Sequence, residues 1–450
     1  MKKTAEKEEF LELAASLRDL LLKDGADDAV VEVARVSSRQ LKFANNKIVK
    51  TGSEAATAIS AFVAKEGRTA STSLRDVSGD RAAAAVKELL KFASSVEPNK
   101  NYGGIAEGPF SYAPIEAFHD KKIPSLQEKS VDLVEGAINA ALAAGAKRCA
   151  GVFEWDEEKR FLATSGGVEA QEQGTTAYFS FRAIAGEGSG HKVGASRTLS
   201  KIDFEGVAER AARVAVDSRK AVEGKPGNYD VVFDSLAFAC LLNEVGAAAS
   251  AFSAESGFSF LTGKTGEKVA SENVNFYDDG RLSNGYDSAL FDAEGVPTRR
   301  TTLIEEGVFK TFLHNTSTAK RFKAKTTGNA GIVVPRAWNL VLREGEWSEE
   351  EMVSEARHGL YITNVWYTRF QNYSSGDFST IPRDGLFLIE NGEITGAVKH
   401  LRVSESMQNL LESVVAVGKK AEQIKSWEAS TPTVTPAVLA RSLKITKPTS

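Results

Sequence analysis

The most constraining feature of this sequence is a repeated order of predicted secondary structure in its first half. The first unit is predicted to contain a helix around residues 10–22, strand-like runs over residues 29–36, 41–50 and 56–69, and a helix over residues 80–94. The second unit is predicted to contain a helix over residues 131–144, strands over residues 148–154, 160–164 and 176–185, and a helix over residues 204–221. Each antiparallel meander must bury one face against its helices. We therefore predict an internal duplication.

Two short segments support this interpretation. Thr57–Phe62 reads TAISAF and Thr176–Phe181 reads TAYFSF, and both occupy the same place in their units. The match is one of pattern more than of identity. Within the second unit, Asp156-Glu157-Glu158 is predicted to be a turn between two strands, and the glycine-rich residues 186–190 are predicted to be a hairpin turn.

The second half of the chain has a different pattern of predicted elements. Pro226-Gly227 precedes a short strand over residues 229–233 and an alanine-rich helix over residues 236–251. Short strand-like runs punctuated by glycine then dominate as far as residue 400, with further helices predicted over residues 349–358 and 409–420. Such spacing is typical of a β-rich domain.

These patterns together predict an α+β fold. We expect an N-terminal domain of residues 1–225, with duplicated α-β-meander-α units at about residues 1–97 and 125–222, followed by a β-rich C-terminal domain of residues 226–450. Residues 98–124, rich in glycine, proline and tyrosine, are predicted to form an irregular connector.

Composition narrows the class of protein. The chain has 450 residues, 56 Lys+Arg against 60 Asp+Glu and 42% hydrophobic residues, which excludes a disordered or collagen-like chain. A net charge of -4 argues against binding DNA through bulk positive charge. No apolar run reaches the roughly 18 residues that span a bilayer, and residues 1–17 are too acidic for a signal peptide. Cys149 and Cys240 lie in runs predicted to be interior, so a disulfide framework is not expected and a cytoplasmic location is predicted.

Local motifs for catalysis are missing. The five histidines never share a helical face, and the two cysteines are too far apart for a CxxC motif, so adjacent residues encode no zinc site. A site assembled from distant residues stays open. Residues 186–190 lack the lysine of a phosphate loop, and the sequence contains no GxSxG motif.

Three segments carry residues suited to chemistry. Residues 291–314 predict an acidic turn leading into a β-hairpin with its tip at Glu305-Glu306-Gly307, residues 367–385 mix aromatic, arginine and acidic residues, and residues 320–325 are basic. A hairpin with solvated charges explains all of the first segment, and for the short third segment a solvated face is favoured over a nucleic-acid patch. For residues 367–385, a cleft wall and a plain polar loop are equally supported, because guanidinium and carboxylate groups can hold a peptide but exposed ion pairs are also common.

The order of these segments resembles the TldD/PmbA family, also called modulators of DNA gyrase, and in particular its PmbA or TldE-like branch. The resemblance covers nearly the whole chain and rests on residues 291–314, 327–330, 376–379, 385–392 and 409–418. It implies an α/β first domain, a β-rich C-terminal domain and a part in a cytosolic zinc metalloprotease system.

The same resemblance implies which zinc ligands this chain lacks. In the catalytic branch a helix bears HExxxH, whose histidines bind zinc while the glutamate acts as general base, and a later cysteine completes the site. The matching helix here covers residues 241–248, where Glu244 falls at the glutamate but Asn243 and Ala248 replace the histidines, and no cysteine follows Cys240. We therefore expect no metal and no cofactor in this chain. Glu244 is a degenerate match, expected to be a surface or cap residue.

The resemblance thus implies a non-catalytic subunit that pairs with a zinc-bearing TldD-like subunit and helps to enclose a groove for unfolded peptide. Extended peptides can add to exposed sheet edges through their main chain. Candidate groove residues are Arg369, Asp377, Arg383 and Asp384. The alternatives are a homodimeric peptide-binding or chaperone-like protein, a stand-alone metallopeptidase with a non-standard site, and a gyrase modulator. Neither nucleic acid nor membrane is expected as a partner.

Overall fold

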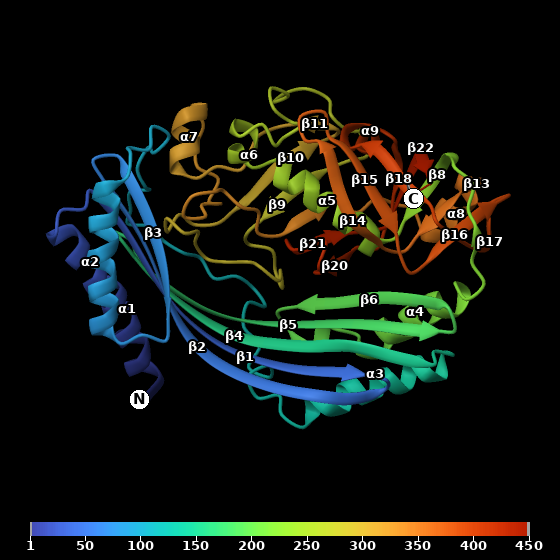
Figure 1. Ribbon diagram of the computed structural model, residues 1–450, viewed down its shortest axis with the longest axis horizontal. Helices are drawn as coiled ribbons and strands as arrows, with labels where there is room; N and C mark the ends of the chain where they lie inside the picture. Colours follow the sequence, from blue (N-terminus) through green and yellow to red (C-terminus); the bar gives the residue numbers. More distant parts are fainter. Residues whose placement is uncertain (1, 448–450) are drawn as a thin grey trace.

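Two layers make up the computed structural model, which describes residues 2–447. A long curved sheet with its helices forms the N-terminal half, and the C-terminal half lies over the open face of that sheet (Figure 1). The N-terminal elements are α1 (Lys2–Lys23), β1 (Asp28–Ala44), β2 (Lys47–Lys65), β3 (Arg68–Arg75), α2 (Gly79–Ser95), α3 (Lys129–Ala143), β4 (Arg148–Thr164), β5 (Glu169–Ala185), β6 (Gly188–Ser196), η1 (Leu199–Lys201) and α4 (Phe204–Asp217).

The C-terminal half contains shorter elements. They are β7 (Val222–Glu223), β8 (Gly227–Phe233), α5 (Ser235–Ala248), α6 (Ala251–Glu255), β9 (Phe276–Asp279), β10 (Arg300–Glu305), β11 (Val308–Phe309), α7 (Thr316–Phe322), β12 (Leu340–Leu342), α8 (Glu349–Ala356), β13 (His358–Ile362), β14 (Val365–Asn372), β15 (Asp377–Pro382), β16 (Leu386–Glu390), β17 (Glu393–Lys399), β18 (Arg402–Ser406), α9 (Met407–Glu412), β19 (Val414–Val417), β20 (Glu422–Ile424), β21 (Thr433–Thr435) and β22 (Val438–Thr446). The α+β fold class predicted from the sequence is confirmed.

The long sheet is built from two copies of the same meander. Its strand order is β3-β2-β1-β4-β5-β6, every neighbouring pair is antiparallel, and β1 and β4 join the copies at the centre. β2 and β5, which carry the two similar six-residue segments, take the equivalent middle place in each copy. The predicted duplication is therefore confirmed, and the two units share one continuous sheet. The predicted boundaries at residues 97, 125 and 225 stay predictions.

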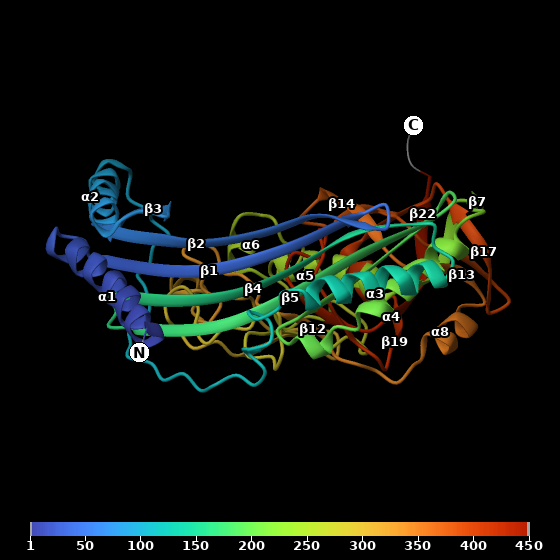
Figure 2. The same cartoon turned by 90° about the horizontal axis from the view of Figure 1, so that it is seen from below.

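The long sheet buries one face against helices and turns the other toward the C-terminal half. In β5, Ala177, Phe179 and Phe181 are fully buried in the core that α3 and α4 cover, whereas the residues between them lie on the opposite face. Burying each phenylalanine contributes roughly 1.5–3 kcal/mol. Figure 2, seen from below, shows α3 and α4 in front of the strands. The polar positions of the sheet are thereby left to face the C-terminal half.

The C-terminal half packs two sheets around α5. A six-stranded sheet has the order β11-β10-β9-β12-β21-β20, and a ten-stranded sheet runs from the edge strand β14 to β7. α5 contacts strands of both sheets, and Leu236, Phe238 and Leu241 are buried in their shared core. An apolar sequence suits this place because nearly every face of the helix meets apolar neighbours. α5 also contacts β14 and β21, one strand from each sheet.

Two predictions about local structure are wrong. Asp156-Glu157-Glu158 is not a turn, because β4 runs unbroken from Arg148 to Thr164 and pairs along its length with both β1 and β5. Ladder hydrogen bonds from both neighbours outweigh the turn preference of three acidic residues. The helix predicted over residues 409–420 ends at Glu412, and Val414–Val417 pairs with β22 instead, as suits its β-branched residues.

Several turns match their predictions. Asn45 and Asn46 connect β1 to β2 with φ angles of 49° and 67°, a conformation that asparagine tolerates well. Residues 186–187 connect β5 to β6, and the β10–β11 hairpin has its tip at residues 306–307.

Cys149 and Cys240 are free and buried, as predicted. Within residues 2–447, no helix combines the length and the apolar character that a membrane span requires.

Candidate functional site

The helix expected from the sequence to match the family's zinc-binding helix is α5. Asp234 caps its start by accepting a hydrogen bond from the backbone N–H of Leu236 at 3.1 Å. Near its end, the Asn243 Nδ2 donates to the Thr431 carbonyl at 3.0 Å and to the Thr433 hydroxyl at 2.8 Å, and the Asn243 Oδ1 accepts from the Thr431 N–H at 2.9 Å. Asn243 therefore ties α5 to the segment that enters β21.

The residues of α5 do not fit a zinc ion. Ala248, at the second histidine position, is 5% exposed and offers only a methyl group. Burial raises the pKa of the Cys240 thiol to about 12, and its Sγ donates to the Leu236 carbonyl at 3.2 Å. Among the described residues, no group of three or more His, Cys, Asp or Glu side chains is placed to hold a metal ion.

Glu244 lines a cavity of about 320 Å³ at the C-terminal end of α5, which we call the α5 cavity. The interpretation of Glu244 as a cap is wrong, because Asp234 and Ala249 are the caps, and the side chain is half-buried. Burial and the nearby Glu428 carboxylate raise the pKa of Glu244 to about 7, while Arg369 acts in the opposite direction. Glu244 is thus a carboxyl group that exchanges its proton near neutral pH.

Glu428 enters this site from the loop between β20 and β21. Its Oε1 accepts from the Tyr367 N–H at 3.2 Å and its Oε2 accepts from the Thr368 N–H at 3.3 Å. Both donors belong to the edge strand β14. The sequence carries no local signal for this role, because Glu428 is a single acid in a tail rich in threonine, serine and proline.

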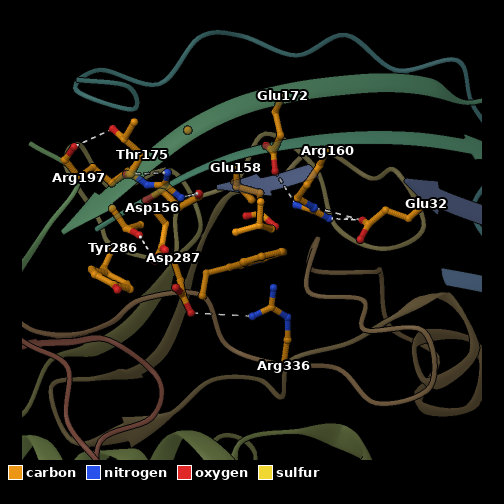
Figure 3. A pocket seen from close by; sticks show the side chains of 16 residues that line it. Glu32, Asp156, Glu158, Arg160, Glu172, Thr175, Arg197, Tyr286, Asp287 and Arg336 are labelled. Atoms are coloured by element: carbon orange, nitrogen blue, oxygen red, sulfur yellow. Dashed lines mark hydrogen bonds and ion pairs between the residues drawn. The ribbon is translucent and has the colours of Figure 1, made fainter. Parts of the chain in front are cut away.

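A second cavity, of about 400 Å³, lies between the two halves and is called the central cavity here (Figure 3). Asp156 and Glu158 reach it from β4, and Arg336 reaches it from the opposite wall. Burial raises the pKa of both carboxyl groups. The Arg336 guanidinium lies over the Trp338 ring at 4.2 Å and 4.0 Å from the Asp287 carboxylate. Because Arg336 also lines the α5 cavity, the two cavities adjoin.

Other arginines of the central cavity already have partners. Arg160 lies 2.7 Å from a Glu32 oxygen and 2.5 Å from a Glu172 oxygen. Arg197 donates from Nε to the Gly285 carbonyl at 2.8 Å and so links the long sheet to the C-terminal half. Charged residues at alternate positions of β4 are the sequence signal for this polar face, and interpreting residues 156–158 as a turn conceals it.

The four predicted groove residues do not lie together. The Asp384 side chain is fully buried, forms an ion pair with Arg182, and accepts from the Ser189 hydroxyl at 2.8 Å and the Asn364 amide at 2.9 Å. Burial raises the pKa of Asp384, but Arg182 and Asn364 outweigh burial and hold it below its ordinary value. Asp384 therefore joins the two halves and is not open to a peptide.

The other three groove candidates are exposed. Asp377 begins β15 and accepts a hydrogen bond from the Ser375 hydroxyl at 2.5 Å. Arg369 on β14 and Arg383 just after β15 lie against neighbouring aromatic rings of β14. Their contact with peptide stays a prediction.

Two family models match this chain. The model of the PmbA/TldA metallopeptidase C-terminal domain matches residues 226–447, and the model of the central domain of the same family matches residues 121–219. The chain belongs to the PmbA/TldA metallopeptidase family. The resemblance predicted from the sequence is thereby confirmed.

Individual relatives give the same result. A metalloprotease from Methanocaldococcus jannaschii is 30% identical over 281 residues, which cover 59% of this chain and 61% of that protein, so the match spans less than two thirds of the relative. A solved Thermotoga maritima protein named as a modulator of DNA gyrase is 26% identical with a TM-score of 0.84, covering 98% of this chain and 100% of the other. TldE from Thermococcus kodakarensis, at 23% identity and a TM-score of 0.86, shares the fold over 96% of this chain and 99% of its own.

Proposed function

We propose that this chain is a non-catalytic, TldE/PmbA-like subunit of a cytosolic zinc metalloprotease complex that cleaves unfolded peptides. A TldD-like subunit supplies the zinc and the general base. The observation that carries this proposal is the use of Asn243, at the position of a ligand histidine, to hold Thr431 and Thr433. A side chain committed to three hydrogen bonds within its own fold has a structural task.

The adjoining cavities support a part in holding the substrate. Glu158 lines the central cavity between the two halves, Glu244 lines the α5 cavity within the C-terminal half, and Arg336 lines both. Groups of both charges can meet the termini and main chain of an extended peptide. The chain's role in the complex is then to bind and orient peptide while the partner performs the hydrolysis.

Metal analysis and a peptidase assay test the proposal together. The purified chain is analysed for zinc and incubated with an unfolded, fluorescently quenched protein substrate, alone and with a TldD-like partner. The matched control is the same partner with the glutamate of its HExxxH motif replaced by glutamine. We expect no stoichiometric zinc in this chain, cleavage only with the intact partner, and no cleavage with the control partner.

Two results would overturn the proposal. Stoichiometric zinc and cleavage by this chain alone would make it a stand-alone metallopeptidase. Binding of unfolded substrate without any association with a TldD-like subunit would make it a peptide-binding protein instead.

A further inference from the structure

An exposed row of stacked guanidinium and aromatic groups runs along β14. The Arg383 guanidinium lies 4.4 Å from the centre of the Trp366 ring, and the Arg369 guanidinium lies 4.1 Å from the centre of the Tyr367 ring. The two rings contact each other with their centres 5.3 Å apart. Trp366 is 40% and Tyr367 50% exposed. We call these four residues the stacked row.

The two arginines bring positive charge to the row. Within residues 2–447, neither Arg369 nor Arg383 forms an ion pair, and Asp384, the acid next to Arg383, is already paired with Arg182. Stacking on a ring leaves the edge of a guanidinium accessible to a carboxylate. Arg369 already donates from Nη1 to the Thr368 carbonyl at 2.6 Å, and its other N–H donors can meet a carboxylate. The guanidinium groups of the row can therefore bind anionic groups such as carboxylates.

One end of the row opens into a cavity of about 350 Å³ that also carries positive charge. Arg383 lines it together with Arg219, which follows α4, and Lys399, at the end of β17. Its acids are Asp384, already paired, and Glu187. At the other end of the row, the Tyr367 N–H donates to Glu428, which lines the α5 cavity. The row therefore connects an anion-attracting cavity with the candidate site.

Recognition along this row must come from side chains. Glu428 already accepts hydrogen bonds from the N–H groups of Tyr367 and Thr368, so this part of the β14 edge is occupied. Tyr367 has a φ of 65°, and the pairing with β15 shifts between Trp366 and Arg369. Such irregularities are typical of edges protected against strand addition. The expected main-chain addition of a peptide is therefore disfavoured at this edge.

We propose that the stacked row and the cavity beside it form a docking site for an acidic, extended segment of a polypeptide. Carboxylates of the segment pair with Arg369 and Arg383, and the intervening residues lie on Trp366 and Tyr367. The inference rests on the proposed function, because it names the charge class of peptide that the subunit holds. A nucleic acid needs a longer basic and aromatic surface than the two rings of the stacked row provide, and the protein has a net charge of -4. Both facts favour a polypeptide as the ligand.

Fluorescence anisotropy with two labelled peptides tests this docking site. One peptide is rich in glutamate and glycine, and the other has lysine in place of every glutamate. Wild-type protein is expected to bind the glutamate peptide at least about tenfold more tightly, with affinity falling as salt rises. The Arg369→Glu, Arg383→Glu double variant is expected to lose that preference. The Arg369→Lys, Arg383→Lys variant, which keeps the charge, is expected to retain part of it.

The matched control is Arg148→Glu, a charge reversal at an exposed arginine on β4 in the other half of the protein. It is expected to bind as wild type does, and thermal melting checks that all variants fold. Equal affinity for the two peptides, or unchanged affinity after both reversals, would overturn the inference. Tighter binding of an oligothymidine than of the glutamate peptide would overturn it in favour of a nucleic-acid surface.

The peptide-binding experiment and the cleavage experiment of the proposed function can fail independently of each other. Cleavage with the TldD-like partner but no preference for the acidic peptide would refute the docking site alone. Arginine-dependent binding of the acidic peptide without partner-dependent cleavage would support the docking site and refute the accessory-subunit role.

Discussion

Asn243 shows how one residue can change what a helix does. At a position where the sequence resemblance implies a metal ligand in the catalytic branch, the amide bridges α5 and the segment that enters β21 through Thr431 and Thr433. The bridge satisfies main-chain groups that lie beside the α5 cavity. The contribution of these hydrogen bonds can therefore be measured as a change in the free energy of unfolding.

Replacing Asn243 with alanine should lower the free energy of unfolding by about 1–3 kcal/mol, because it leaves polar groups of Thr431 without their partners. Urea denaturation measures this difference. Ala247→Ser, at an exposed position of the same helix, is the control and should change little. An Asn243→Ala variant as stable as wild type would contradict the role assigned to the amide. Asn243→His should also be destabilised and should bind no zinc.

Glu244 should make stability depend on pH near neutrality. Its pKa of about 7 in the folded protein exceeds the ordinary value of 4.5, so the folded state holds more protons than the unfolded state between these values. Stability therefore falls as pH rises across that window. Glu244→Gln should be more stable than wild type above pH 7, by on the order of 2 kcal/mol, and should match it near pH 4.5.

Unfolding free energies of both proteins at several pH values test this. Glu393→Gln, which replaces an exposed carboxyl group, is the control and should leave the pH profile unchanged. A constant difference between Glu244→Gln and wild type across the pH range would show that Glu244 does not titrate as described.

At the scale of elements, β4 decides the shape of the N-terminal half. It pairs with β1 on one side and β5 on the other, and so it joins the two duplicated units. Its even-numbered positions 156, 158 and 160 line the central cavity. A turn in this place would split the sheet and remove the polar wall of that cavity.

A proline in β4 tests this continuity. Glu158→Pro removes a backbone donor from the sheet and should destabilise the protein by about 3 kcal/mol or more. Glu158→Ala changes the side chain alone and should cost far less. Thermal and urea unfolding of the two variants give the comparison. Equal stability of both variants would indicate that residues 156–158 form a tolerant turn after all.

At the scale of the whole molecule, contacts of buried polar side chains help to hold the two halves together. Asp384 reaches from the C-terminal half to Arg182 and Ser189 on the long sheet. Arg197 reaches the other way, to the Gly285 carbonyl. Arg197 also lines the central cavity between the halves.

Replacing Asp384 with asparagine should lower stability at neutral pH by about 3 kcal/mol, because it leaves the Arg182 charge without its buried partner. The pKa of Asp384 is lowered in the folded state, so this contribution is present above the ordinary pKa of an aspartate and is lost as pH falls through the folded value. The difference from wild type should therefore shrink in acid. Asp377→Asn, at an exposed aspartate, is the control. A difference that stays constant into acid would contradict the ion pair.

The sequence by itself determined the local structure and the family. Helical spacing and strand alternation act over a few residues, so they revealed the duplication, most turns and the β-rich second half. The absence of histidine at positions 243 and 248, where the resemblance implies zinc ligands, was equally visible, because it concerns one short stretch of a single helix.

Tertiary structure alone decided which distant residues meet. Arg182 and Asp384 are 202 residues apart in sequence, and no local pattern predicts their ion pair. The same holds for Glu428, which caps the edge of β14, and for Arg336, which links the two cavities. The acidic run at 156–158 shows the physical reason: its own preference for a turn is weak, and hydrogen bonds from two neighbouring strands, both placed by the rest of the chain, override it.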